Sequence, residues 1–279
     1  IFKICQIILQ LILLYFTKEY MLYLILQVIT TFLTNLYLSN KSKKMYPFLK
    51  ELGNNQLEKK ETKKIFDNVK ALFIYKLGGV ALHGTDSIII SKYLGLIVLG
   101  LYSNYYLLVS AITQILSQLF NAFTSSIGNL IAKETKEKAK KVFNQLYYFT
   151  IFIYAVVCIC LYLLFNDFIT IWLGKQYLLS NVVVLTIVGH LYVNGVQFAG
   201  FTFRNASGNF KQFKYSPIFS AVLNIVISII LAKYIGLAGV FIGTIISRVC
   251  TSTWIDPYII YKNVFKENVR EYFIKYIKY

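Results

Sequence analysis

Ionisable side chains interrupt the apolar sequence between residues 71 and 90, and they share one face of the helix expected there. Lys76, Gly79, His83, Asp86 and Ser87 fall within an arc of roughly 100° at 100° per residue. Ionisable groups cost free energy in hydrocarbon and occur there mainly where they line a water-filled path. We therefore predict a hydrated cavity beside this helix. Plainer roles stay open, because Lys76 and Asp86 could reach the membrane surfaces and the imidazole of His83 could be hydrogen-bonded between helices.

A second polar stripe follows the segment 94–120 and continues just beyond it. Polar side chains recur there at three- and four-residue steps, with Ser110, Gln114, Ser117 and Asn121 at the centre of the stripe. These steps place the side chains on one helix face, and a face turned toward lipid gains nothing from them. We predict that this stripe lines the same cavity, where its hydroxyl and amide groups would hydrogen-bond a polar ligand.

Fainter polar stripes mark two later apolar segments. His190, Asn194 and Gln197 recur on one face of segment 182–201, and Asn224 is the central polar residue of segment 217–232. Such side chains often join helices by hydrogen bonds worth about 1 kcal/mol each, without lining any path. A secondary polar path and simple helix packing are both open for these residues.

Arg248 lies well inside the last apolar segment of the chain. A guanidinium is always charged, and its planar donors form paired hydrogen bonds with phosphate oxygens. We predict that Arg248 binds a phosphate or a diphosphate. The alternative is a structural pair with a carboxylate or with backbone carbonyls.

The sequence lacks the motifs of nucleotide hydrolysis, dinucleotide binding, and metal or nucleophilic catalysis. It contains no G-x-x-x-x-G-K-[ST], no G-x-G-x-x-G after a strand, no H-E-x-x-H and no nucleophile elbow. The cysteines form no C-x-x-C pair and have no histidine at ligand spacing, which indicates packing positions for Cys5, Cys158, Cys160 and Cys250. We expect no enzymatic activity, no cofactor and no bound metal.

The composition of the chain is that of a membrane protein. Of its 279 residues, 57% are hydrophobic and only 15% are charged, a balance typical of helices surrounded by lipid. The formal net charge is +17, but Lys and Arg fall in short clusters between apolar runs rather than along one folded face. We therefore expect no nucleic-acid partner and predict anionic membrane lipids as partners instead.

A membrane-spanning helix needs about 20 apolar residues to cross ~30 Å of hydrocarbon. The sequence contains about eight such segments, and no window of about ten residues alternates as a barrel strand would. We predict an all-α polytopic membrane bundle with spans at residues 1–16, 20–38, 71–90, 94–120, 142–165, 182–201, 217–232 and 237–259.

Lysine and arginine gather in every second connection between these segments. The basic connections lie at 39–70, 133–141 and 204–214 and in the tail after residue 261, whereas the intervening turns hold Lys92, Lys175 and Lys233 alone. Basic loops of this kind stay in the cytoplasm. The heavy use of Ile, Lys, Asn and Tyr also resembles coding by an AT-rich bacterial genome. We predict a multi-pass protein of the bacterial plasma (inner) membrane, with both ends of this chain in the cytoplasm.

Three stretches of the sequence resemble one family of membrane transporters. They are GTDSIIISKYLGLIVLGLYSNYYLLVSAITQILSQLFNAFTSSIGNL at 84–130, RNASGNFK at 204–211 and GLAGVFIGTIISR at 236–248. These stretches are similar to bacterial polysaccharide repeat-unit flippases, of the O-antigen or capsule type, in the multidrug/oligosaccharidyl-lipid/polysaccharide exporter superfamily. The likeness extends over about residues 71–266. It consists of spacing and small residues, so it points to the family but not to a substrate.

The resemblance implies two six-helix lobes that together export lipid-linked oligosaccharides. Under it, this chain would begin within the N-terminal lobe and lack the first four helices of that lobe. This chain would then consist of four parts: the last two helices of the N-terminal lobe at 1–38, a basic cytoplasmic interlobe linker at 39–70, the C-terminal six-helix lobe at 71–260 and a basic cytoplasmic tail at 261–279.

The resemblance also implies a cargo and partners. The cargo would be a polyprenyl-diphosphate-linked oligosaccharide, and a polysaccharide polymerase and glycosyltransferases would act beside the protein. Lys76 and Arg248 would meet the diphosphate, and the stripe at 110–121 would hydrogen-bond the sugar hydroxyls. Two other functions stay open: an ion-coupled drug or metabolite antiporter, for which Asp86 is the main acidic candidate, and a non-transporting membrane scaffold.

Overall fold

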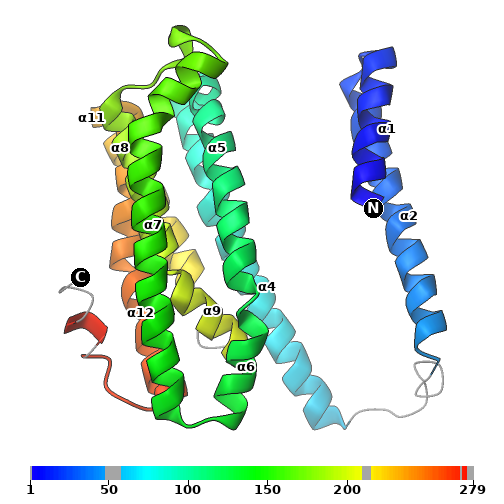
Figure 1. Cartoon of the computed structure of the whole chain (residues 1–279), viewed down its shortest axis with the longest axis vertical. Coiled ribbons are helices and arrows are strands. Elements are labelled where there is room, and N and C mark those ends of the chain that lie inside the picture. The colour runs from blue at the N-terminus through cyan, green and yellow to red at the C-terminus, as the bar shows by residue number, and fades with distance from the viewer. Residues whose placement is uncertain (1, 48–57, 209–214, 271, 275–279) are drawn as a thin grey trace. The chain divides into compact units, whose positions relative to one another are not determined.

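The computed structural model describes residues 2–47, 58–208, 215–270 and 272–274, without the side chains of Lys64, Leu82 and His83. Every regular element in these ranges is a helix, which confirms the predicted all-α fold (Figure 1). The elements are α1 (Phe2–Thr17), α2 (Tyr20–Met45), α4 (Lys59–Tyr93), α5 (Leu96–Asn121), α6 (Thr124–Lys133), α7 (Lys136–Trp172), the short 3-10 helix η2 (Lys175–Tyr177), α8 (Asn181–Val196), α9 (Phe198–Ser207), α11 (Ser216–Cys250), α12 (Ser252–Ile260) and the π-helix η3 (Tyr261–Phe265).

Five helical stretches of the described residues are long and apolar enough to cross a membrane, so the chain is a multi-pass membrane protein. Two further predicted spans fall in helices outside this group. α1 is apolar but has only 16 residues, and α4 is less apolar because charged and polar side chains interrupt it. Whether α1 and α4 cross the membrane stays a prediction. The five stretches are Tyr20–Met45, Leu96–Lys133, Lys136–Trp172, Asn181–Ser207 and Ser216–Phe265.

The last of these stretches contains a reversal, because α11 folds back on itself. Ile235 and Gly236 leave helical geometry, and Gly236 has a φ of 62°, which glycine adopts without steric cost. The amide of Asn224 then donates a hydrogen bond of 2.7 Å to the hydroxyl of Thr244. Twenty residues of straight helix would separate these groups by ~30 Å. α11 is therefore a helical hairpin. It contains the predicted segment 217–232 and the first part of segment 237–259, which continues into α12.

The described chain forms two compact units, residues 1–63 and 64–279. In the first unit α1 packs against α2, and the rings of Phe2 and Tyr37 lie 5.3 Å apart. Both ends of the predicted linker at 39–70 are helical, because α2 continues to Met45 and α4 begins at Lys59. The assignment of these units to two lobes of a transporter stays a prediction.

Small residues hold the helices of the second unit close together. α7 packs against α8, and α8 packs in turn against the α11 hairpin (Figure 1). Gly195 of α8 lies so close to the ring of Tyr154 on α7 that a Cβ atom would overlap the ring. Within the hairpin, a Cβ atom on Gly243 would lie 2.7 Å from Cα of Ser228. Helix association in lipid depends on such close backbone approach, so these contacts form the frame of the unit.

The predicted basic tail at 261–279 is packed along its first part. Phe265 and Tyr272 are only 1% and 6% exposed. Their rings lie 5.6 Å and 6.3 Å from the ring of Phe143 on α7. Aromatic contacts therefore anchor the segment after α12 to α7, whereas residues 275–279 lie outside the described residues.

Candidate functional site

A cavity of about 680 Å³ lies within the second unit, among α4, α8, α9, α11 and α12. α5 contributes Tyr106 and Asn121 to its wall. Charged groups inside a membrane bundle are costly and usually mark a path for polar solutes, so these charges make the cavity the candidate site. Among the described residues, the wall carries three cations and one carboxylate, namely Lys76, Arg204, Arg248 and Asp256.

Four residues predicted from the sequence lie together on the wall of this cavity. They come from four different helices: Lys76 from α4, Asn121 from α5, Asn194 from α8 and Arg248 from α11. Residues far apart in the chain therefore share one polar hollow. Their role in a substrate path stays a prediction.

Arg248 is the most deeply buried cation of the cavity wall. It is only 2% exposed, and its Nε atom is buried without a hydrogen-bond partner. Among the described residues, its guanidinium makes no hydrogen bond or ion pair, although the carboxylates of Asp86 and Asp256 act on it through space. A buried charge without a direct counter-ion is costly, so this guanidinium is available to an anion that enters the cavity.

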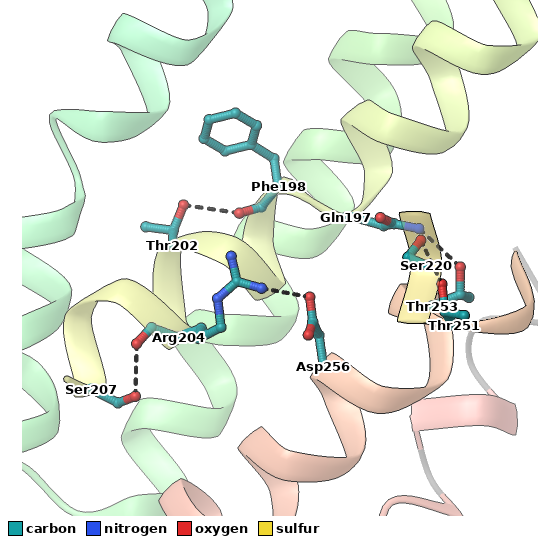
Figure 2. A network of polar contacts seen from close by, with 9 residues as sticks. All are labelled: Gln197, Phe198, Thr202, Arg204, Ser207, Ser220, Thr251, Thr253 and Asp256. Atoms are coloured by element: carbon teal, nitrogen blue, oxygen red, sulfur yellow. Dashed lines mark hydrogen bonds and ion pairs between the residues drawn. The ribbon is translucent and has the colours of Figure 1, made fainter. Parts of the chain in front are cut away.

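The second buried cation, Arg204, forms an ion pair across two helices (Figure 2). Its Nη1 atom lies 2.8 Å from Oδ2 of Asp256, and the two side chains are 5% and 4% exposed. The guanidinium also lies over the rings of Tyr75 and Phe201, 4.5 Å and 4.8 Å from the ring centroids. Three helices, α4, α9 and α12, thus meet at one charged group.

This ion pair is not predicted from the sequence, where Arg204 stands among the cations of a basic connection. A signal was present, since a lone carboxylate inside the apolar segment 237–259 needs a partner. Arg204 could not be recognised as that partner, because the predicted span ended at Phe201 whereas α9 continues to Ser207.

Neutral hydrogen bonds also join the helices beside the ion pair (Figure 2). Gln197, which precedes α9, donates from Nε2 to the hydroxyl of Thr253 on α12 over 2.9 Å. The hydroxyl of Thr251 donates to Oγ of Ser220 on α11, also over 2.9 Å. Gln197 is not among the described residues of the cavity wall, so its hydrogen bond joins α12 to the start of α9 and does not face the cavity.

Asp86 and Asn224 lie in a polar cluster between α4 and the α11 hairpin. Asp86 is 6% exposed, and its Oδ1 accepts a hydrogen bond of 3.1 Å from the hydroxyl of Thr244. Asn224 donates to the same hydroxyl, and its own Oδ1 accepts from Thr85 over 3.0 Å. These contacts join helices, and neither residue is on the cavity wall. The side chain of His83 lies outside the described residues, so its role stays a prediction.

Most of the predicted stripe on α5 does not reach this cavity. The hydroxyls of Ser110 and Ser117 donate to backbone carbonyls of their own helix, over 2.9 Å in each case. The side chain of Gln114 is exposed. Asn121 does line the cavity, because it ends α5 at the bend that precedes α6. A path along the rest of the stripe stays a prediction.

The described part of the chain holds no group of three or more His, Cys, Asp or Glu side chains that could bind a metal ion. His190, from the fainter stripe, packs its ring against Phe241 with 6.2 Å between the centroids. The charged, amide and hydroxyl side chains on the cavity wall can bind a polar ligand by ionic contacts and hydrogen bonds.

The chain matches one known protein family. Residues 24–182, more than half of the chain, match the family model described as polysaccharide biosynthesis protein. The chain belongs to this family. No curated protein and no solved structure matches the chain.

The region that matches the family model, residues 24–182, covers only part of the cavity. It includes Lys76 and Asn121, whereas Arg204, Arg248 and Asp256 lie beyond residue 182. These three residues are therefore assigned to the candidate site by the geometry of the cavity and not by the family match.

Proposed function

We propose that this protein forms part of a flippase that moves polyprenyl-diphosphate-linked oligosaccharide repeat units across the bacterial plasma membrane. The cavity receives the diphosphate and the adjoining sugars, while the polyprenyl chain stays in lipid. The observation that supports this most strongly is the buried Arg248 guanidinium, which lines the cavity without an ion pair among the described residues. The diphosphate is the anionic group that such a membrane-bound polysaccharide precursor would carry.

The charges of the cavity are complementary to a diphosphate. Among the described residues of the wall, three cations and one carboxylate give a net charge of +2, and each phosphate of a diphosphate diester carries one negative charge. Asn121, Asn194 and Thr202 add amide and hydroxyl groups suited to sugar hydroxyls. The cavity volume of about 680 Å³ falls within the range of ~300–1,000 Å³ usual for ligand sites. Size and charge together favour an oligosaccharide head group with a diphosphate.

The proposed orientation follows from the basic connections. The N-terminal part of α4, with Lys70, and the α6–α7 turn, with Lys133 and Lys136, lie at the same end of the second unit (Figure 1). The positive-inside rule assigns this end to the cytoplasm. Two predicted spans precede the basic connection at 39–70 and six follow it, so the same rule assigns both ends of this chain to the cytoplasm, where glycosyltransferases would supply the cargo. A polymerase on the other side of the membrane would consume it.

An ion-coupled drug or metabolite antiporter is the second candidate, and the charges of the cavity disfavour it. A cationic drug requires acidic groups that face it. The carboxylate on the wall, Asp256, is already paired with Arg204, and Asp86 lies outside the wall. A non-transporting scaffold would gain nothing from a buried guanidinium beside an open cavity.

Depletion of the full-length protein in its bacterial source is expected to abolish surface polysaccharide and to raise the amount of lipid-linked repeat units. Synthesis of these units on the cytoplasmic leaflet continues while their translocation stops. Mass spectrometry of extracted lipids measures the total amount. Lectin binding to everted and to right-side-out membrane vesicles measures the leaflet in which the sugars lie.

Two outcomes of the depletion experiment would contradict the proposed function. Normal surface polysaccharide together with altered sensitivity to cationic drugs would favour the antiporter. Loss of surface polysaccharide without accumulation of repeat units would place the defect before translocation.

A further inference from the structure

We infer that the carboxylate of Asp256 is a built-in counter-ion that competes with the incoming diphosphate for Arg204 and thereby lowers the affinity of the cavity for its cargo. In the empty cavity Arg204 pairs with Asp256. When the diphosphate arrives, the guanidinium exchanges the carboxylate for a phosphate oxygen. This inference rests on the proposed function and concerns the same cavity.

The ion pair is held through one oxygen of the carboxylate. Nη1 of Arg204 donates to Oδ2 of Asp256 over 2.8 Å, whereas Oδ1 of Asp256 is buried and has no hydrogen-bond partner among the residues that the structure describes. A buried ion pair is stabilising only when further hydrogen bonds satisfy its remaining polar atoms. An incompletely satisfied pair that lines an open cavity is therefore suited to exchange with another anion.

Two aromatic rings keep Arg204 in place during such an exchange. Tyr75 and Phe201 contact the guanidinium at 4.5 Å and 4.8 Å from their ring centroids. These contacts place Cζ of the guanidinium over the two rings, whereas its hydrogen bonds are donated by its N–H groups. Arg204 can therefore change its hydrogen-bond partner from Asp256 to a phosphate while both rings stay in contact.

The counter-ion would serve the release of the cargo. Arg204 and Arg248 would bind a dianion tightly, because both are buried and charge attraction is stronger at a buried site than in bulk water. An exporter must also let its cargo go. Asp256 takes Arg204 back when the diphosphate leaves, so release does not leave a second buried guanidinium without an anion. Removing this carboxylate should tighten binding and slow export.

The test compares Asp256→Asn with the wild-type full-length protein, purified in detergent, in the binding of a polyprenyl-diphosphate-linked monosaccharide. We expect Asp256→Asn to bind about tenfold more tightly and to export less polysaccharide in cells. Asp256→Glu keeps the charge, so its affinity should match that of the wild type. Glu267→Gln is the matched neutral control, because Glu267 pairs with Lys140 away from the cavity wall, and its affinity should also be unchanged.

The outcomes separate this inference from the proposed function. Equal affinity of the wild type and Asp256→Asn would overturn the counter-ion inference and leave the flippase proposal standing. Equal tightening by Asp256→Glu would also overturn it, because the effect would then come from packing. Absence of binding by every form of the protein would contradict the proposed function itself. Thermal unfolding checks each variant, and the smaller neutral Asp256→Ser replaces Asp256→Asn if that variant does not accumulate.

Discussion

Arg248→Ala in the full-length protein is expected to reduce surface polysaccharide by about 30-fold or more, because losing one partner of a buried charged contact costs about 2–5 kcal/mol of binding. The guanidinium is 2% exposed on the wall of the cavity, where the proposed diphosphate would meet it. The protein should stay abundant in the membrane. Arg248 makes no ion pair with a described residue, so its removal leaves no directly paired carboxylate behind. Quantitative immunoblots of surface polysaccharide and of membrane protein measure the two quantities.

Arg270→Ala is the matched control for this experiment, because it removes the same side chain from an exposed position after α12. It should leave surface polysaccharide unchanged. Arg248→Lys should give an intermediate level, because it keeps the charge but loses the planar donors that pair with phosphate. Unchanged polysaccharide in Arg248→Ala would remove Arg248 from the binding site.

Arg204→Ala is expected to lower the free energy of unfolding by about 3–5 kcal/mol, because it leaves the carboxylate of Asp256 buried without its cation. The ion pair is almost completely enclosed, with side chains 5% and 4% exposed. The guanidinium also lies over the rings of Tyr75 and Phe201, and these contacts are lost with it. Denaturant unfolding of the purified protein in detergent measures the change.

The double variant Arg204→Ala with Asp256→Ala separates charge from packing. It removes the uncompensated carboxylate, so it should recover a large part of the stability that Arg204→Ala loses. The coupling energy from the double-mutant cycle then gives the interaction between the two residues. A single variant as stable as the wild type, or a double variant no better than the single one, would show that the pair does not stabilise the unit.

Helices were predictable from the sequence because the membrane leaves the backbone few choices. In hydrocarbon every N–H and C=O group must be paired within the segment, so a long apolar run forms a helix. The reversal of α11 at Gly236 falls between two predicted spans for the same reason. The packing of Phe265 and Tyr272 against Phe143 was not predictable, because it depends on tertiary contacts between distant parts of the chain.

The site was predictable only in part, because periodicity tells which side chains share a helix face but not what that face meets. Lys76 and Arg248 were found because ionisable residues are conspicuous inside apolar segments. Gln114 shares a polar stripe with Asn121, yet of these two only Asn121 lines the cavity. The pairing of Arg204 with a residue 52 positions later depends on how α9 and α12 pack, which no local pattern encodes.

Cysteine labelling of the full-length protein tests most directly whether the cavity is water-filled and takes the cargo. In a form whose native cysteines are replaced, Asn121→Cys and Asn194→Cys should react in membranes with a charged thiol reagent. Added polyprenyl-diphosphate-linked oligosaccharide should protect both positions. Leu163→Cys, at a side chain 65% exposed on α7 that is expected to face lipid, should stay unreactive. Unreactive cysteines at both cavity positions, or labelling that the cargo does not slow, would contradict the proposed function.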